Sequence, residues 1–191
     1  MRLFVGIELP PIARSAIDAA VTRLRSRLAR SSPGLDARWV ESEKLHVTLW
    51  FLGEVADDRL SSVMTALDQP FPTAAFPLRV AGFGAFPPSG PVRVIWMGIP
   101  QGGAELRSVN AEVSTRVVPL GFEPDRKVYT AHLTVARVRD PRSARGRALR
   151  DALDTESSDV PPFTVTAVTL FRSRLSPKGS QYEVLLRVPL S

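Results

Sequence analysis

The chain has 191 residues, 44% hydrophobic and 23% charged, so it can bury a core, and disorder is excluded as the default state. It contains no cysteine, which excludes disulfide bonds, thiolate metal sites and cysteine nucleophiles. The formal net charge is +6, which favours anionic partners such as RNA or phosphorylated nucleotides. Only three of the 25 basic residues are lysine, so a compositional bias toward arginine is an alternative explanation of the charge.

The amino terminus predicts a first strand and not a leader peptide. Residues 1–9 form a short apolar run that contains Glu8 and ends at Pro10, too short and too charged for a secretory signal. No apolar run in the sequence approaches the roughly 20 residues needed to span a bilayer. We therefore expect a soluble, cytoplasmic protein without a membrane anchor, present as a monomer.

The first half of the chain alternates extended and helical segments. Residues 12–30 carry apolar side chains at three- and four-residue spacing, which predicts an amphipathic helix. We expect a second helix at 57–67 and strands at 2–9, 37–40, 45–52 and 76–86. The loop at 87–91, rich in proline and glycine, is the natural boundary between two halves.

The second half repeats the order of elements and adds a strand at its end. We expect helices at 104–118 and 142–153 and strands at 92–99, 128–138, 163–171 and 181–188. Each half then follows the order strand, helix, strand, helix, strand. This order predicts an α+β fold with one domain over residues 1–191, made of two duplicated lobes at about 1–90 and 91–191 that are related by an approximate two-fold axis.

The chain has two histidines, and each occupies a His-x-Thr motif in an apolar strand: His46 with Thr48, and His132 with Thr134. Side chains alternate along a strand, so each threonine lies on the face of its histidine. The same rule assigns Trp50 to the face of His46 and gives packing roles to the other face, which carries Leu45, Val47, Leu49 and Phe51. Two lobes related by a two-fold axis would bring both histidines to one ligand in a cleft.

Two histidines in one cleft suit general acid and base catalysis, because an imidazole with a pKa near 6.5 can be neutral or charged at neutral pH. Cleavage of a phosphodiester needs both forms. One imidazole takes a proton from the attacking water or hydroxyl, and the other protonates the departing oxygen. The hydroxyls of Thr48 and Thr134 would donate hydrogen bonds to the non-bridging oxygens. No carboxylate stands at ligand spacing from either histidine, so we expect no metal.

Residues around the second motif are weaker candidates. Arg126 and Tyr129 could bind phosphate or base, and Phe122 could stack on a base, although packing or surface roles explain them more simply. Strand alternation puts Arg137 on the face opposite His132, where an ion pair explains it at least as well as a phosphate contact. Three further aromatic residues are assigned to the core: Trp39, Phe86 and Trp96.

Residues 45–49 and 131–135 resemble the two signatures of the 2H phosphoesterase superfamily. More narrowly, they resemble those of the bacterial and archaeal RNA 2',3'-cyclic phosphodiesterases, also called 2'-5' RNA ligases. The resemblance covers nearly the whole chain, through the segments 2–10, 38–40, 45–55, 129–137 and 170–182. Two positions depart from the family pattern. Ala131 stands where proline commonly precedes the histidine, and Trp50 is bulky enough to narrow the pocket.

The resemblance implies a bilobal fold in which two antiparallel-rich sheets, with helices outside, face each other across a central basic cleft. It implies hydrolysis of a 2',3'-cyclic phosphate on RNA ends or nucleotides to a 2'-phosphate, with no metal or nucleotide cofactor. By analogy, His46 would protonate the leaving 3' oxygen and His132 would activate water. The same site run in reverse would join a cyclic phosphate to a 5' hydroxyl.

Two other functions stay open on the sequence. A non-catalytic module that binds RNA or nucleotides would use the same basic cleft without turnover, and the altered flanks of both motifs favour it. A metal hydrolase would lose its activity in the presence of a chelator.

Overall fold

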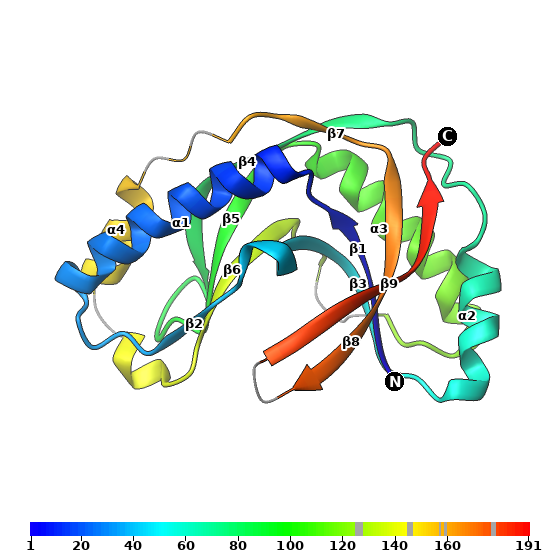
Figure 1. The fold of residues 1–191 in the computed structure, drawn as a ribbon, viewed down its shortest axis with the longest axis horizontal. Helices are drawn as coiled ribbons and strands as arrows, with labels where there is room; N and C mark the ends of the chain where they lie inside the picture. Colours follow the sequence, from blue (N-terminus) through cyan, green and yellow to red (C-terminus); the bar gives the residue numbers. More distant parts are fainter. Residues whose placement is uncertain (125–127, 145–146, 157, 159, 177–178) are drawn as a thin grey trace.

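The computed structural model describes every residue except 125–127, 145–146, 157, 159 and 177–178. Its strands form one curled antiparallel sheet, and four α helices of the described chain lie on the outer side of that sheet (Figure 1). The prediction of an α+β fold is confirmed.

The sheet has nine strands in the order β7-β4-β5-β6-β3-β1-β8-β9, with β2 paired to β6 outside this path. The hydrogen-bonded neighbours are antiparallel. The bounds of the strands, in chain order, are β1 Arg2–Glu8, β2 Ala37–Trp39, β3 His46–Glu54, β4 Phe76–Phe86, β5 Val94–Gln101, β6 His132–Val138, β7 Phe163–Val165, β8 Ala167–Ser176 and β9 Gly179–Pro189.

The two separate sheets expected from the sequence are continuous halves of this one sheet, which corrects that part of the prediction. The halves join where Val47 of β3 pairs with Leu133 of β6. Both side chains are fully buried, so one face of the junction packs on the hydrophobic core. Burying this pair removes apolar surface from water, which favours a continuous sheet at this point.

The order of the strands contains an internal two-fold relation. If β1 is exchanged with β5, β3 with β6 and β4 with β8, the central order β4-β5-β6-β3-β1-β8 reads the same in reverse. Each half of the sheet therefore includes two strands from the other half of the chain: β4 pairs with β5 and β2 with β6, while β8 pairs with β1 and β9 with β8. The halves of the sheet do not coincide with residues 1–90 and 91–191.

The helices form where the apolar spacing predicts them. Helix α1 (Pro11–Ser31) begins with proline, which suits the first turn because its missing N–H would be unpaired there. Its buried side chains are those that define the predicted apolar face: Ala13, Ile17, Ala20, Val21, Leu24 and Leu28. The other helices are α2 (Leu60–Leu67), α3 (Gly103–Val117) and α4 (Arg147–Thr155). Helix α1 packs on α4, and α3 packs on β3 and α2.

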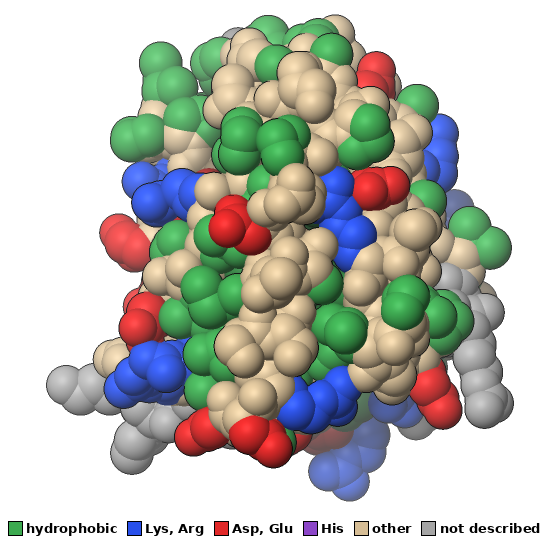
Figure 2. Space-filling view, turned by 90° about the vertical axis from the view of Figure 1, so that its right-hand side faces the viewer, with side chains coloured by type: hydrophobic (Ala, Val, Ile, Leu, Met, Phe, Trp, Pro, Cys, Tyr) green, Lys and Arg blue, Asp and Glu red, His purple; other side chains and the backbone are tan. Residues whose placement is uncertain are grey.

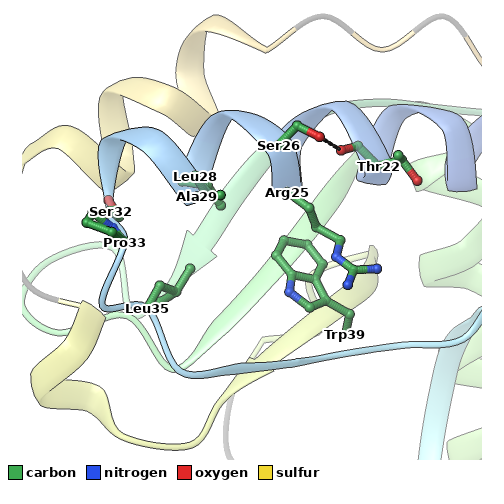
Figure 3. Close-up of a pocket in the computed structure, with 9 residues that line it drawn as sticks. All are labelled: Thr22, Arg25, Ser26, Leu28, Ala29, Ser32, Pro33, Leu35 and Trp39. Carbon is green, nitrogen blue, oxygen red and sulfur yellow. Dashed lines mark hydrogen bonds between the residues drawn. The ribbon is translucent and has the colours of Figure 1, made fainter.

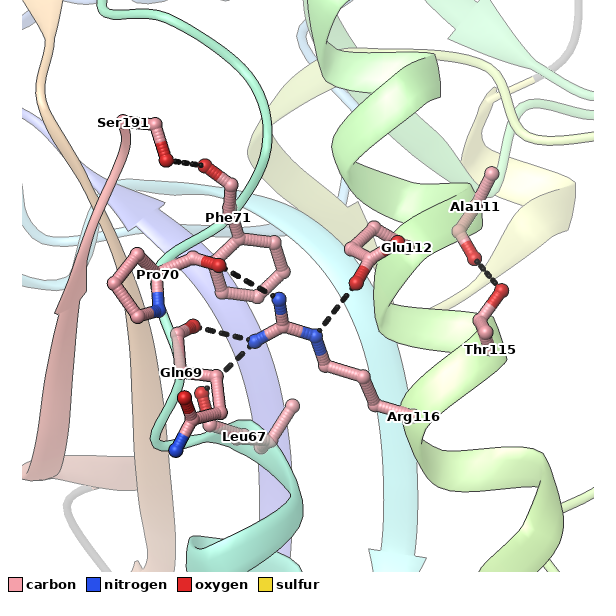
Figure 4. Close-up of polar contacts among 9 residues, drawn as sticks. All are labelled: Leu67, Gln69, Pro70, Phe71, Ala111, Glu112, Thr115, Arg116 and Ser191. Carbon is pink, nitrogen blue, oxygen red and sulfur yellow. Dashed lines mark hydrogen bonds and ion pairs between the residues drawn. The ribbon is translucent and has the colours of Figure 1, made fainter.

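Arg116 of α3 holds the loop that follows α2 (Figure 4). Its guanidinium donates hydrogen bonds to the carbonyl oxygens of Leu67, Gln69 and Pro70 at 3.1, 2.6 and 3.0 Å. The guanidinium also donates a hydrogen bond to the carboxylate of Glu112 on the same helix at 2.9 Å. It lies 4.0 Å from the centre of the Phe71 ring. One side chain thus connects the last turn of α2, the following loop and α3.

No helix within the described residues is long and apolar enough to cross a membrane. Figure 2 shows the side of the molecule at the right of Figure 1, where acidic and basic side chains are interspersed and no histidine is visible. The net positive charge is therefore not gathered on this face.

Candidate active site

The junction of β3 and β6 places both His-x-Thr motifs on one face of the sheet. Val47 and Leu133 pair directly and point into the core. Because side chains alternate, the histidine and the threonine of each motif point to the opposite face, which the helices leave open (Figure 1). The strands are antiparallel, so His46 lies toward Thr134 and Thr48 lies toward His132. The structure thus brings together the four motif residues that the sequence singled out.

Each histidine ring is held by the same local hydrogen bond. The Nδ1–H of His46 donates to the carbonyl oxygen of Lys44 at 2.8 Å, and that of His132 donates to the carbonyl of Thr130 at 2.7 Å. A carbonyl can only accept, so the proton lies on Nδ1 whether the ring is neutral or charged. The Nε2 atom of each ring is therefore left to exchange a proton with a ligand.

Aromatic side chains pack around His46. The ring of Phe4 lies 4.7 Å from it, and that of Tyr182 meets it edge-on at 5.1 Å. Phe4 in turn stacks on Phe171, with the ring centres 4.8 Å apart. Gly6 of β1 allows this close packing, because a Cβ there would lie 2.8 Å from a backbone oxygen and would approach the imidazole.

His132 has its own aromatic neighbours. The ring of Phe86 meets it edge-on at 5.1 Å, and Trp96 lies 6.5 Å away. The Trp96 ring covers Gly84, where a Cβ would come within 2.3 Å of it. The sequence analysis predicts that Phe86 and Trp96 belong to the core. Both are only partly buried, and they flank the second histidine, which corrects that assignment.

The surroundings of both histidines favour the neutral ring. Burial is the main cause that lowers the pKa of His46, and the positive charges of Arg137 and His132 lower it further. Burial also lowers the pKa of His132, with a smaller contribution from Arg137. The hydrogen bonds to the backbone carbonyls act in the opposite direction on both rings. One arginine thus acts on both imidazoles.

A β-bulge in each motif strand changes which side chains face the site. Thr48 pairs with Gly6 but Trp50 pairs with Val5, so Leu49 is an extra residue on β3. Thr134 pairs with Trp96 and Ala136 with Ile95, so Val135 is an extra residue on β6. An extra residue reverses the alternation for the rest of the strand. The faces assigned from the sequence are therefore wrong beyond each bulge.

The residues affected by the bulges are Trp50, Phe51 and Arg137. Trp50 pairs with Val5, next to Gly6, so it does not share the face of His46 and packs in the core at 8% exposed, yet it still lines the cavity that contains Thr48 and His132. Phe51 pairs with Phe4, two residues from Gly6, and therefore points to the same face as Thr48. Arg137 pairs with Val94, on the face of Thr134, consistent with its effect on both histidines.

The remaining predicted site residues have varied placements. Arg126 lies outside the described residues. The Tyr129 hydroxyl donates a hydrogen bond to the backbone carbonyl of Thr48 at 3.0 Å, so it ties the loop before β6 to β3, and burial raises its pKa. Phe122 is only 9% exposed and lies beneath the guanidinium of Arg59, so its ring is not free to stack on a base.

The family model for LigT-like phosphoesterases matches the chain twice, at residues 12–96 and 98–182, with one motif histidine in each match. The chain belongs to the LigT-like phosphoesterase family. This confirms the family predicted from the two motifs. The double match also shows that the family repeat is duplicated in the chain, in agreement with the two-fold relation of the strands.

Relatives of this LigT-like phosphoesterase cover nearly its whole length. The RNA 2',3'-cyclic phosphodiesterase of Archaeoglobus fulgidus is 33% identical, and the match covers 97% of this chain and 98% of the relative. The RNA 2',3'-cyclic phosphodiesterase of Aeropyrum pernix is 32% identical, and the match covers 88% of this chain and 93% of the relative. The crystal structure of TT0787 of Thermus thermophilus has a TM-score of 0.77 at 28% identity, and the match covers 100% of this chain and 98% of TT0787. E. coli LigT complexed with 3'-AMP shares the fold, with a TM-score of 0.74 at 22% identity.

A cavity of about 1170 Å³ in the LigT-like phosphoesterase is lined from both motif strands. Its lining includes Thr48 and Phe51 of β3, His132 of β6 and Tyr129 in the preceding loop. A cavity of this size accommodates a nucleotide, which is an ordinary ligand for a concave site with a few polar groups. Within the described chain, no three His, Asp or Glu side chains cluster as metal ligands.

A second, smaller groove of about 460 Å³ lies between α1 and the segment that leads to β2 (Figure 3). Its main feature is the guanidinium of Arg25, 5.5 Å from the centre of the Trp39 ring. The groove is lined by neither histidine. Of the two motif histidines, His132 lines the larger cavity, and His46 lies on the same face of the sheet beside Phe4 and Tyr182.

Proposed function

We propose that this LigT-like phosphoesterase hydrolyses 2',3'-cyclic phosphate ends of RNA or nucleotides to 2'-phosphates, without a metal or nucleotide cofactor. The observation that carries the proposal is the matched pair of imidazoles, each fixed through Nδ1 and free at Nε2, on one face of the sheet. The names of the full-length relatives support the choice of substrate. We also propose that residues 1–191 act as one monomeric domain of two duplicated lobes, about 1–90 and 91–191 in the sequence, which are related by an approximate two-fold axis and exchange strands within the one sheet.

The proposed reaction is an in-line displacement at phosphorus. His132 takes a proton from water, and the resulting hydroxide oxygen forms a bond to phosphorus. The bond from phosphorus to the 3' oxygen breaks, and His46 gives its proton to that oxygen, which leaves the phosphate on the 2' oxygen. Thr48, Thr134 and Arg137 donate hydrogen bonds to the non-bridging oxygens as their negative charge grows.

The lowered pKa values of the two histidines predict the pH dependence. The base must be neutral and the acid must be protonated, so kcat/KM should follow a bell-shaped profile. Because both pKa values lie below 6.5 in the free protein, the imidazolium is lost at lower pH than usual. We therefore expect the maximum of kcat/KM below pH 6.5, measured with a nucleoside 2',3'-cyclic phosphate.

Arg137→Gln should move both limbs of that profile to higher pH. The positive charge of Arg137 disfavours both imidazolium ions, so its removal raises both pKa values. Arg107→Gln is the matched control, because Arg107 is exposed on α3 outside the cavity lining. If the two limbs of the pH profile stay in place in R137Q, or move by the same amount in R107Q, then Arg137 does not act on the imidazoles.

The activity itself is tested by incubating the protein with 2',3'-cyclic nucleotides and with short RNAs that end in a cyclic phosphate, each with and without chelator. The position of phosphate in the product is then identified. A 2'-phosphate formed in both conditions is the expected result. Loss of activity with chelator would favour a metal hydrolase, and binding without any product would favour a non-catalytic RNA-binding module. Adding an RNA with a free 5' hydroxyl tests the reverse, ligating reaction.

A further inference from the structure

Two side chains hold the backbone of the β3 bulge, where Thr48 of the first motif is followed by the extra residue Leu49. The hydroxyl of Tyr129, in the loop before β6, donates a hydrogen bond to the carbonyl oxygen of Thr48 at 3.0 Å. The side-chain amide of Asn110, on α3, donates one to the carbonyl oxygen of Leu49 at 2.8 Å. The two peptide groups that follow the Thr48 side chain are therefore held by residues of other elements.

The equivalent bulge on β6 is held in a different way. The carbonyl oxygen of its extra residue, Val135, accepts a hydrogen bond at 2.9 Å from the backbone N–H of Val40, which follows β2. Among the described residues, the segment before β6 forms no such strand beside Thr48 and Leu49. Side chains thus take over at β3 the role that the backbone has at β6. A substitution removes a side-chain hydrogen bond without changing the backbone, so each bond at β3 can be removed separately.

Both donors belong to packed parts of the molecule. Asn110 is partly buried, and it is flanked on α3 by Val109 and Val113, which are fully buried. Tyr129 packs against the hydrophobic core. Burial raises the pKa of Tyr129, so its hydroxyl keeps its proton and continues to donate over the pH range in which the histidines titrate. Two donors fixed in this way restrict the movement of the bulge.

We propose that Tyr129 and Asn110 are positioning residues, which hold the bulge so that the Thr48 hydroxyl points at a non-bridging oxygen of the bound phosphate. The proposal rests on the proposed function, in which Thr48 donates a hydrogen bond to that oxygen. Thr48, Asn110 and Tyr129 line the cavity that contains His132, so a shift of the bulge moves the Thr48 hydroxyl relative to the substrate. Tyr129 acts through Thr48 and not by binding phosphate or base itself.

This role predicts a loss of turnover rather than of binding. The non-bridging oxygens gain negative charge in the transition state, so a well-placed donor contributes more there than in the bound ground state. A misplacement of about 1 Å in such a group can lower the rate by about a hundredfold. A bulge that keeps one of its two bonds should move less than that, and the loss should be smaller.

The first test measures kcat and KM for a nucleoside 2',3'-cyclic phosphate in two variants. Tyr129→Phe removes only the hydroxyl, and Asn110→Leu keeps the approximate size of the side chain but removes the donor. Each should lower kcat about tenfold and change KM by less than about twofold. Ser108→Ala is the matched control, because Ser108 is exposed on α3 and lies outside the cavity lining, and it should leave both constants unchanged.

The second test separates positioning of Thr48 from general support of the fold, by adding Tyr129→Phe to Thr48→Ala and to Thr134→Ala. Without the Thr48 hydroxyl there is no donor left to position, so Tyr129→Phe should change the kcat of T48A by less than about twofold. It should lower the kcat of T134A about tenfold, as in the wild-type protein, because the Thr134 hydroxyl belongs to β6.

Wild-type values of kcat in both Tyr129→Phe and Asn110→Leu would overturn the proposal. Equal losses in the T48A and T134A backgrounds would also overturn it, because Tyr129 would then support the fold as a whole and not the position of Thr48. Failure of the proposed function is distinguished by the wild-type protein, which would then hydrolyse no cyclic phosphate.

Discussion

Replacing His46 or His132 with alanine is expected to lower kcat for a nucleoside 2',3'-cyclic phosphate by about a hundred- to ten-thousand-fold. Each imidazole holds its Nδ1 proton against a backbone carbonyl, so Nε2 is the only atom of the ring that can move a proton to or from the substrate. Initial rates at saturating substrate measure the loss. Either variant with full activity would exclude two-histidine catalysis.

A substrate with a better leaving group separates the roles of the two histidines. A nitrophenyl phosphodiester releases a stable phenolate and needs little help from an acid, so His46→Ala should lose far less activity on it than on the cyclic phosphate. His132→Ala should be impaired on both substrates, because the attacking water still needs a base. The reverse pattern would make His132 the acid and His46 the base. Added imidazole should restore part of the activity if the loss is chemical and not structural.

Replacing Arg116 with alanine should lower the free energy of unfolding by about 3 kcal/mol, because hydrogen bonds to charged groups contribute more than neutral ones. The side chain is only 10% exposed, and its removal leaves three carbonyl acceptors of the segment after α2 without their donor. It also removes the cation that lies over the Phe71 ring. Chemical denaturation followed by circular dichroism measures the change.

Two further variants show which property of Arg116 accounts for this loss of stability. Arg116→Lys keeps the charge but not the planar fork, so it should recover only part of the stability. Arg107→Ala removes an exposed arginine from the same helix and should change the free energy of unfolding by less than about 0.5 kcal/mol. If R116A and R107A were equally stable, the carbonyls would be satisfied by water, and Arg116 would have no structural role.

The corrections to the predicted site share one cause. The sequence placed Trp50 on the site face and Phe51 and Arg137 away from it, because strict alternation was carried through each strand. The bulges at Leu49 and Val135 reverse that alternation. A bulge depends on how a strand pairs with its neighbour, and that neighbour is distant in the sequence, so no local pattern of apolar residues reveals it.

The sequence by itself determined the elements of the fold, the family and the two motif histidines with their threonines. Apolar spacing is a local property, which is why the buried face of α1 agrees with the predicted one residue by residue. Only the tertiary structure decided that the sheet is continuous through Val47 and Leu133 and that the Tyr129 hydroxyl bonds to β3. It alone placed Phe51 and Arg137 on the site face. These features depend on contacts between segments far apart in the chain, and such contacts exist only when the whole sheet has formed.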